Sequence, residues 1–178
     1  MSTLKVGTIQ DHSNSNNALV IDSSGRVTEP AKPCFAVKSN RAVNTADFTT
    51  AAGVPFNEIE VQRGGTIVAI SGSGDTTSAV FTAPITGIYQ FNLMVNLTSA
   101  GGGNFNSTLL YIDGATVGGQ NDPTYRNLDD NTGGYHGMSS SFLISLNTGQ
   151  TVTPFLNCSG DSSVTVRNGC RFSGFLVA

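Results

Sequence analysis

Residues 81–95, FTAPITGIYQFNLMV, contain a proline and a glycine that lead straight into a regular alternation of side chains. From Tyr89 onward the odd positions are aromatic or aliphatic, whereas the even positions read Gln90, Asn92, Met94 and Asn96. A period of two over about nine residues is typical of a β-strand with one face in a core. The opposite, more polar face meets either water or another subunit, and this stretch alone leaves both alternatives open.

The composition favours short strands joined by polar turns. Gly contributes 21 of the 178 residues, Ser, Thr and Asn are abundant, and charged residues make up only 12%. No long stretch is rich in the helix formers Ala, Leu, Glu and Lys, so we predict an all-β sandwich or barrel with a substantial core. Each of the three cysteines, Cys34, Cys158 and Cys170, is predicted to be a small core residue, because an odd count without a secretion signal argues against a disulfide framework.

The charge is low and evenly spread. The nine Lys and Arg are scattered singly, and the net charge is −3. Nucleic-acid binding through phosphate contacts is therefore not expected. No apolar run approaches the length of a membrane span, and the N-terminal residues lack the compact apolar core of a signal peptide. We expect no membrane insertion, and synthesis in a cytoplasm.

The first thirty residues differ from the rest of the chain. TLKVGTIQ and ALVIDSSGRVTEP predict two short strands, which DHSNSNN joins, with a turn at DSSG. So small a piece cannot hold a core of its own, and we predict that residues 1–30 form an attachment or oligomerisation segment. Pro30 and Pro33 make residues 31–33 a stiff hinge. The main domain is predicted to span residues 34–178.

Strands are predicted throughout the main domain. Asp113–Gly114 and the NTG at 147–149 supply residues for tight hairpin turns. Residues 99–106 and 118–137 are predicted loops, and the length of the second is typical of a functional or mobile segment. The expected strands cover residues 34–38, 56–61, 66–71, 78–83, 88–97, 107–112, 137–146, 150–157 and 170–177.

Two of these strands are apolar on both faces. In CRFSGFLVA, Phe175 and Val177 alternate with Phe172 and Leu176, and Phe155 likewise points opposite to its apolar neighbours. A strand that is apolar on both faces requires burial on both faces. Because a two-layer sandwich covers only one face, the second face indicates a partner subunit.

Phe81, Pro84, Gly87, Tyr89 and Phe91 follow the spacing F-x-x-P-x-x-G-x-Y-x-F. This spacing resembles a motif of the jelly-roll domain of complement C1q and tumour necrosis factor. CFAVKSN precedes this block, and LLYIDGATV, LISLNTGQTVTPFL and CRFSGFLV follow it in the order of the family's strands. The chain therefore resembles this family over about residues 34 to 178.

The resemblance implies an all-β, two-sheet jelly-roll sandwich that forms a tight homotrimer. The sheet that holds the first, the last and the GIYQFNLMV strands would line the trimer axis, and a monomer with a solvated face is the alternative. We expect these residues near the axis: Met94, Phe155, Phe175, Val177, Gln90, Asn92 and Asn96. The core is expected to contain Phe81, Tyr89, Phe91, Leu93, Val95, Phe172 and Leu176.

The N-terminal stretch LKVGTIQDHSNSNNALVIDSSGRV resembles the leaders of structural proteins from marine tailed phages, especially cyanophages. This implies a virion protein, made in the host cytoplasm, whose residues 1–30 bind other virion proteins. Its jelly-roll head would form a trimeric tail fibre or appendage that attaches to a host surface glycan or receptor. A trimeric capsid decoration protein and a free C1q-like receptor- or glycan-binding module are the alternatives.

The sequence offers no recognisable catalytic set. His12 and His136 are the only histidines, both in predicted loops, and the G-x-S-x-G, H-E-x-x-H and P-loop patterns are missing. We therefore expect neither an enzyme nor a cofactor. Asp122, Asp129 and Asp130 share one loop and are weak candidates for oxygen ligands of Ca²⁺, although solvated loop acids are the commoner case.

Overall fold

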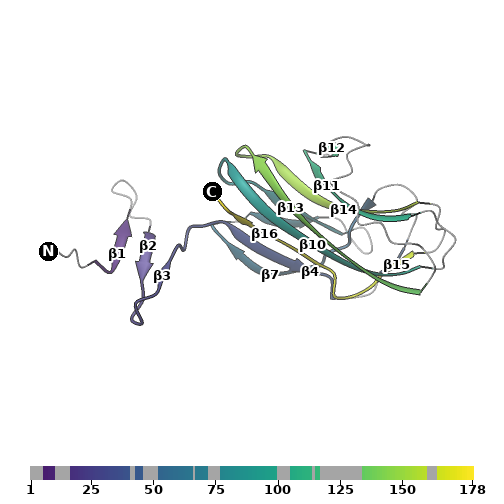
Figure 1. Cartoon of the computed structure of the whole chain (residues 1–178), viewed down its shortest axis with the longest axis horizontal. Coiled ribbons are helices and arrows are strands. Elements are labelled where there is room, and N and C mark those ends of the chain that lie inside the picture. The colour runs from purple at the N-terminus through teal and green to yellow at the C-terminus, as the bar shows by residue number, and fades with distance from the viewer. Residues whose placement is uncertain are drawn as a thin grey trace.

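The computed structural model consists of β-strands in two packed layers, with a small separate sheet towards the N-terminus (Figure 1). The prediction of an all-β, two-sheet sandwich is confirmed. The described part of the chain contains no helix that is long and apolar enough to cross a membrane. The structure describes residues 6–10, 17–40, 43–45, 52–65, 67–71, 77–99, 105–113, 115–116, 134–159 and 164–178.

One layer is a seven-stranded sheet centred on β10, the strand that follows the FTAPITG turn. β10 pairs along its full length with β13 on one side, and on the other side with β16 and then β15. β4 and β7 continue the sheet beyond β16, and β5 continues it beyond β15. The strands are β4 (Cys34–Lys38), β5 (Val43–Thr45), β7 (Glu58–Arg63), β10 (Gly87–Ser99), β13 (Gly134–Leu146), β15 (Val164–Val166) and β16 (Arg171–Leu176).

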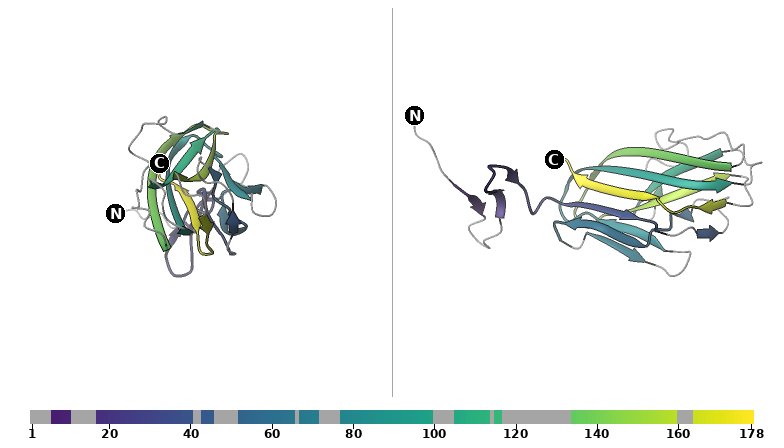
Figure 2. Two further views of the ribbon diagram at one scale, coloured as in Figure 1. Left: turned by 90° about the vertical axis from the view of Figure 1, so that its right-hand side faces the viewer. Right: turned by 90° about the horizontal axis from the view of Figure 1, so that it is seen from below.

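The other layer is a six-stranded sheet around β14. β14 pairs with β11 on one side and with β9 and β6 on the other, while β12 and β8 lie outermost. Figure 2 shows this layer packed against the first. The strands are β6 (Ala52–Gly53), β8 (Val68–Ser71), β9 (Ser78–Thr82), β11 (Phe105–Ile112), β12 (Ala115–Thr116) and β14 (Thr151–Ser159).

The core between the two sheets is rich in aromatic rings. Phe35, Phe81, Phe91 and Phe172 form a cluster whose neighbouring ring centroids are 5.0 to 6.3 Å apart. Gly174 makes room for two of these rings, because a Cβ there would lie 2.6 Å from Phe91 and 2.7 Å from Phe35. Of the residues expected in the core, Leu176 is partly buried and the others are fully buried: Phe81, Tyr89, Phe91, Leu93, Val95 and Phe172.

The turn before β10 is closed by the residues of the FTAPITGIY pattern. The hydroxyl group of Tyr89 donates a hydrogen bond of 2.7 Å to the carbonyl oxygen of Ile85, four residues earlier. Burial raises the pKa of this hydroxyl, so it stays a donor. Gly87 is needed because a Cβ there would lie 2.7 Å from the carbonyl oxygen of Ala178. The pattern therefore fixes where the C-terminal end of the chain meets β10.

Some connections differ from the sequence expectation. The NTG at 147–149 is not a hairpin, because β13 before it and β14 after it belong to different sheets. The loop predicted at 118–137 ends earlier, since residues 134–137 begin β13, and its residues 118–133 lie outside the described part of the chain. The hairpin expected at 113–114 agrees with the antiparallel pairing of β11 and β12, in which Ile112 lies opposite Ala115.

The N-terminal sheet is a meander of β1 (Thr8–Gln10), β2 (Asn17–Ile21) and β3 (Val27–Thr28), one strand more than predicted. Asp22 closes the β2–β3 turn, where it accepts 2.9 Å hydrogen bonds from the backbone N–H groups of Ser24 and Arg26. None of its described residues belongs to the buried core. The sheet lies beyond one end of the sandwich, from which residues 29–33 separate it (Figure 2).

Candidate subunit interface

The seven-stranded sheet has an outer face that is turned away from the six-stranded sheet. The even positions of β10 lie on this face, as do the odd positions of β13 and β16 with which they pair. Three cross-strand rows define it: Leu143–Gln90–Phe175, Ser141–Asn92–Ser173 and Ser139–Met94–Arg171. The structure brings together here six of the seven residues expected at the axis: Met94, Phe175, Val177, Gln90, Asn92 and Asn96.

The end of the outer face nearest the hinge is apolar, and we call it the apolar base. It comprises Ile88, Leu143, Phe175 and Val177, all of which are exposed. Leu143 on β13 is 64% exposed, and Phe175 near the end of β16 is 45% exposed. Large apolar side chains that cluster in water mark an interaction surface.

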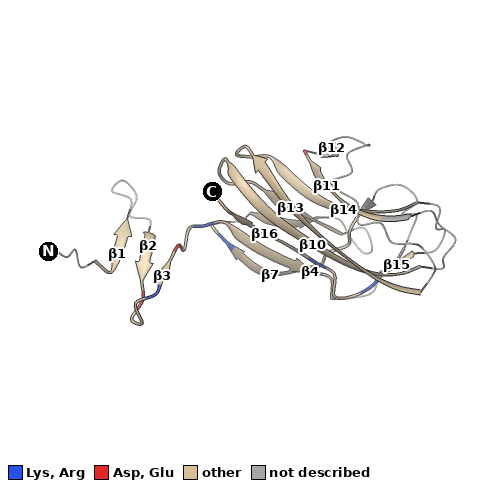
Figure 3. Cartoon of the chain, in the orientation of Figure 1, with Lys and Arg blue, Asp and Glu red and all other residues tan. Residues whose placement is uncertain are grey.

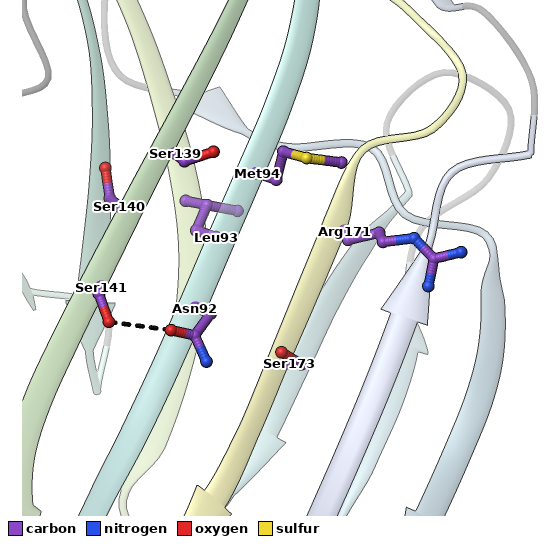
Figure 4. Close-up of a pocket in the computed structure, with 8 residues that line it drawn as sticks. All are labelled: Asn92, Leu93, Met94, Ser139, Ser140, Ser141, Arg171 and Ser173. Carbon is purple, nitrogen blue, oxygen red and sulfur yellow. Dashed lines mark hydrogen bonds between the residues drawn. The ribbon is translucent and has the colours of Figure 1, made fainter.

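A polar band follows the apolar base along β10. Gln90 donates a hydrogen bond of 2.6 Å to the hydroxyl group of Ser141, which donates one of 2.9 Å to the side-chain oxygen of Asn92. A hollow of about 360 Å³ lies beside these hydrogen bonds (Figure 4). It is present because the side chains of Ser139, Ser141 and Ser173 are too small to fill the face. The band is therefore hydrogen-bonded within one chain and shallowly concave.

Four charged residues form a cluster beyond the polar band, within a sandwich that has few charges (Figure 3). Glu60 accepts hydrogen bonds of 2.5 and 3.3 Å from the guanidinium of Arg171 and lies 3.2 Å from the ammonium of Lys38. The ammonium also lies 3.0 Å from Glu58. The two carboxylates raise the pKa of Lys38, and Lys38 with Asn40 lowers the pKa of Glu58. These charges are thus satisfied within one chain.

Phe155 corrects one expectation about the axis. It lies on β14, in the six-stranded sheet, and so is not on the face that carries Phe175. Its ring stacks on the ring of Tyr111 on the neighbouring strand, with centroids 3.9 Å apart. Phe155 is therefore only partly exposed, because a side chain of its own sheet packs against it, which the alternation pattern could not show.

The remaining candidate groups are dispersed. The Ca²⁺ candidates Asp122, Asp129 and Asp130 lie outside the described residues, as does His12, while His136 lies on β13 rather than in a loop. Within the described ranges, no three His, Cys, Asp or Glu side chains are grouped as a metal site would need. All three cysteines are free; Cys158 and Cys170 are buried, whereas Cys34 is only partly buried.

The sandwich is similar to solved jelly-roll structures. It superposes on the globular domain of zebrafish complement 1qA protein with a TM-score of 0.56 and 18% identity, over 83% of this chain and 98% of that chain. Murine APRIL at pH 8.0 gives a TM-score of 0.55 and 14% identity, over 82% of this chain and 99% of that chain. The chain has the C1q/TNF-like jelly-roll fold.

At these identities the likeness concerns the fold alone. No protein-family model matches the sequence, and no curated protein matches it. The role of the outer face therefore has to be inferred from its own residues.

Proposed function

We propose that the chain is a non-enzymatic virion structural protein whose jelly-roll body forms a homotrimer, with the outer face of the seven-stranded sheet around the three-fold axis. The observation that carries the trimer is the apolar base, where Leu143 and Phe175 are exposed side by side with Gln90 between them. Removal of apolar surface from water is favourable by about 25 cal/mol per Å², and this gain opposes the entropic cost of association. Three copies around an axis would remove these side chains from water.

The polar band supports the same assembly. Burial of a polar group is costly when it loses its hydrogen bonds to water without replacement. Gln90, Asn92 and Ser141 already bond to one another, so a neighbouring copy can cover them at a small cost. The hollow of about 360 Å³ leaves space for water molecules between copies.

The N-terminal sheet supports attachment to other virion proteins. Its exposed apolar side chains lie outside the buried core, and β1 and β3 are the two outer strands of the sheet. Unpaired strand edges accept further strands from a partner. Residues 1–30 would thus anchor a trimeric tail fibre or appendage, and the opposite end of the body would bind a host surface glycan or receptor.

Deletion of residues 1–30 tests this function. The truncated chain is expected to remain a trimer that melts cooperatively, and to be absent from purified particles. Electron microscopy of particles that carry the full chain should show it on the tail. A truncated chain that unfolds would contradict the domain boundary, and one that joins particles normally would contradict the anchor. Density on the capsid shell would instead identify a decoration protein.

A further inference from the structure

A second hollow lies at the distal end of the outer face, the end remote from the N-terminal sheet. β15 lies at this end (Figure 1), and the first residues of β13 lie there too, because Thr98 pairs with both strands. The hollow has a volume of about 350 Å³, and its lining includes Asn96, Tyr135, Arg167 and Asn168. We call these four residues the distal cluster. None of them contributes to the apolar base.

Tyr135 and Arg167 form the centre of the distal cluster. At 78% exposure, Tyr135 is the most exposed large apolar side chain among the described residues. The Cζ atom of Arg167 lies 5.3 Å from the centroid of its ring. A guanidinium held over an aromatic ring keeps its N–H groups directed outward in its own plane. Within the described ranges, no salt bridge joins Arg167 to a carboxylate.

The backbone beneath the cluster is held rigidly. The N–H of Arg167 donates a 2.8 Å hydrogen bond to the carbonyl oxygen of Asn96. The thiol of Cys170 donates to the carbonyl oxygen of Arg167 at 3.1 Å and accepts from the N–H of Asn96 at 3.3 Å. Burial raises the pKa of this thiol, which keeps its proton. Gly169 packs closely against Asn96, since a Cβ at position 169 would lie 3.3 Å from the side-chain nitrogen of Asn96.

We propose that the distal cluster binds a carboxylate-bearing sugar, such as a uronic acid unit of an acidic surface polysaccharide. A planar guanidinium fork matches a carboxylate in bidentate geometry. The carboxamides of Asn96 and Asn168 offer both donors and acceptors to sugar hydroxyl groups, and the ring of Tyr135 offers apolar surface to the sugar's C–H groups. This proposal specifies the class of sugar that the proposed attachment function would recognise, and it rests on that function.

The test is titration of the full-length chain with tri-galacturonic acid and, in parallel, with its methyl ester, followed by calorimetry. The ester keeps the size and the hydroxyl groups and removes the charge. The free acid is expected to bind at least about tenfold more tightly than the ester. Arg167→Lys keeps the charge but loses the fork, and should weaken binding of the acid about tenfold. The exposed Arg63 on β7 provides the matched control, and Arg63→Lys should leave the affinity unchanged.

Other outcomes overturn the proposal. Equal affinity for the acid and the ester would show that the carboxylate is not recognised. An equal loss of affinity for the acid in Arg63→Lys and Arg167→Lys would show only general charge attraction. Preference for a sulfated trisaccharide over the uronate would contradict the planar carboxylate specifically. Light scattering on the same samples separates the two proposals, because a trimer that binds none of these sugars refutes the distal site alone.

Discussion

Phe155 and Phe175 look alike in the sequence but are placed very differently. Each lies on a strand near the C-terminus and alternates with the core residues of that strand. The ring of Phe155 stacks on Tyr111 of the neighbouring strand at 3.9 Å. Phe175 instead lies between Gln90 and Cys34 on its two neighbouring strands, and it is 45% exposed.

The contrast indicates which outer face the proposed partner subunits would cover. A strand that is apolar on both faces needs cover on both, but the cover can come from the same sheet. On the six-stranded sheet, Tyr111 supplies it. On the seven-stranded sheet, the neighbours of Phe175 in its row are polar or small, and the next apolar residue, Leu143, is itself 64% exposed. The argument for an oligomer therefore rests on the face that carries Phe175 and Leu143, and Phe155 adds nothing to it.

The sharpest way to break this comparison is a matched pair of substitutions. Phe175→Asp would place a charge in each of three copies near the axis, and burial of unpaired charges costs several kcal/mol per ion. We expect this variant to fold as a monomer, as measured by light scattering and circular dichroism. Phe155→Asp should remain a trimer with a somewhat lower melting temperature. Trimers from both variants would refute the assignment of the axis.

A second comparison sets the two faces of β10 against each other. Phe91 is fully buried in the aromatic cluster, and Phe91→Ala should lower the free energy of unfolding of each subunit by about 3–5 kcal/mol. Met94→Ala, three residues later on the outer face, should cost the subunit much less. Urea denaturation of both variants, in a Phe175→Asp background that removes assembly, measures this directly. A similar decrease in the free energy of unfolding for both variants would mean that the two faces of β10 are assigned wrongly.

A smaller effect is expected at Gly174, where the backbone packs closely against two aromatic rings of the core. A Cβ at this position would meet the rings of Phe91 and Phe35 at less than van der Waals distance. Gly174→Ala should therefore destabilise the subunit by about 1–3 kcal/mol through overpacking. Ser173→Ala, on the outer face beside it, serves as the control. Thermal melting curves that do not distinguish the two variants would contradict the packing.

The smallest effect is expected from the charged cluster on the outer face. The pKa of Glu58 is lowered from 4.5, so its contribution to stability is complete above about pH 4.5 and is lost as the pH falls through the lowered value. The pKa of Lys38 is raised from 10.5, so its contribution is lost only as the pH rises through the raised value. In melting curves from pH 3 to 7, Glu58→Gln should be slightly less sensitive to acid than the unaltered chain. An increased sensitivity would contradict the sign of the shift.

Most of the sandwich could be predicted from the sequence because its long strands alternate over many residues. β5, β6 and β15 were missed, since two or three residues cannot show an alternation, and β12 was expected only as the second arm of the hairpin at 113–114. The turn at 147–149 was misassigned because turn residues specify a change of direction but not the sheet that the next strand joins. For the same reason, Phe155 was assigned to the wrong sheet.

The distal cluster could not be predicted at all. Asn96, Tyr135 and Arg167 are separated by tens of residues, and Tyr135 fell within a predicted loop. Only the pairing of β10 with β13 on one side and with β15 on the other brings them together. By contrast, Phe175 and Val177 of the apolar base were expected on the outer face, because they alternate with the core residues Phe172 and Leu176. Ile88 and Leu143 were not singled out.

The mass of the unaltered chain in solution tests the central claim most directly. Light scattering coupled to size-exclusion chromatography should give three times the 18.5 kDa of one chain. The value should stay constant as the loading concentration is lowered a hundredfold, because the apolar base and the polar band are both buried in the trimer. A mass of one chain throughout that range would show that the outer face meets water.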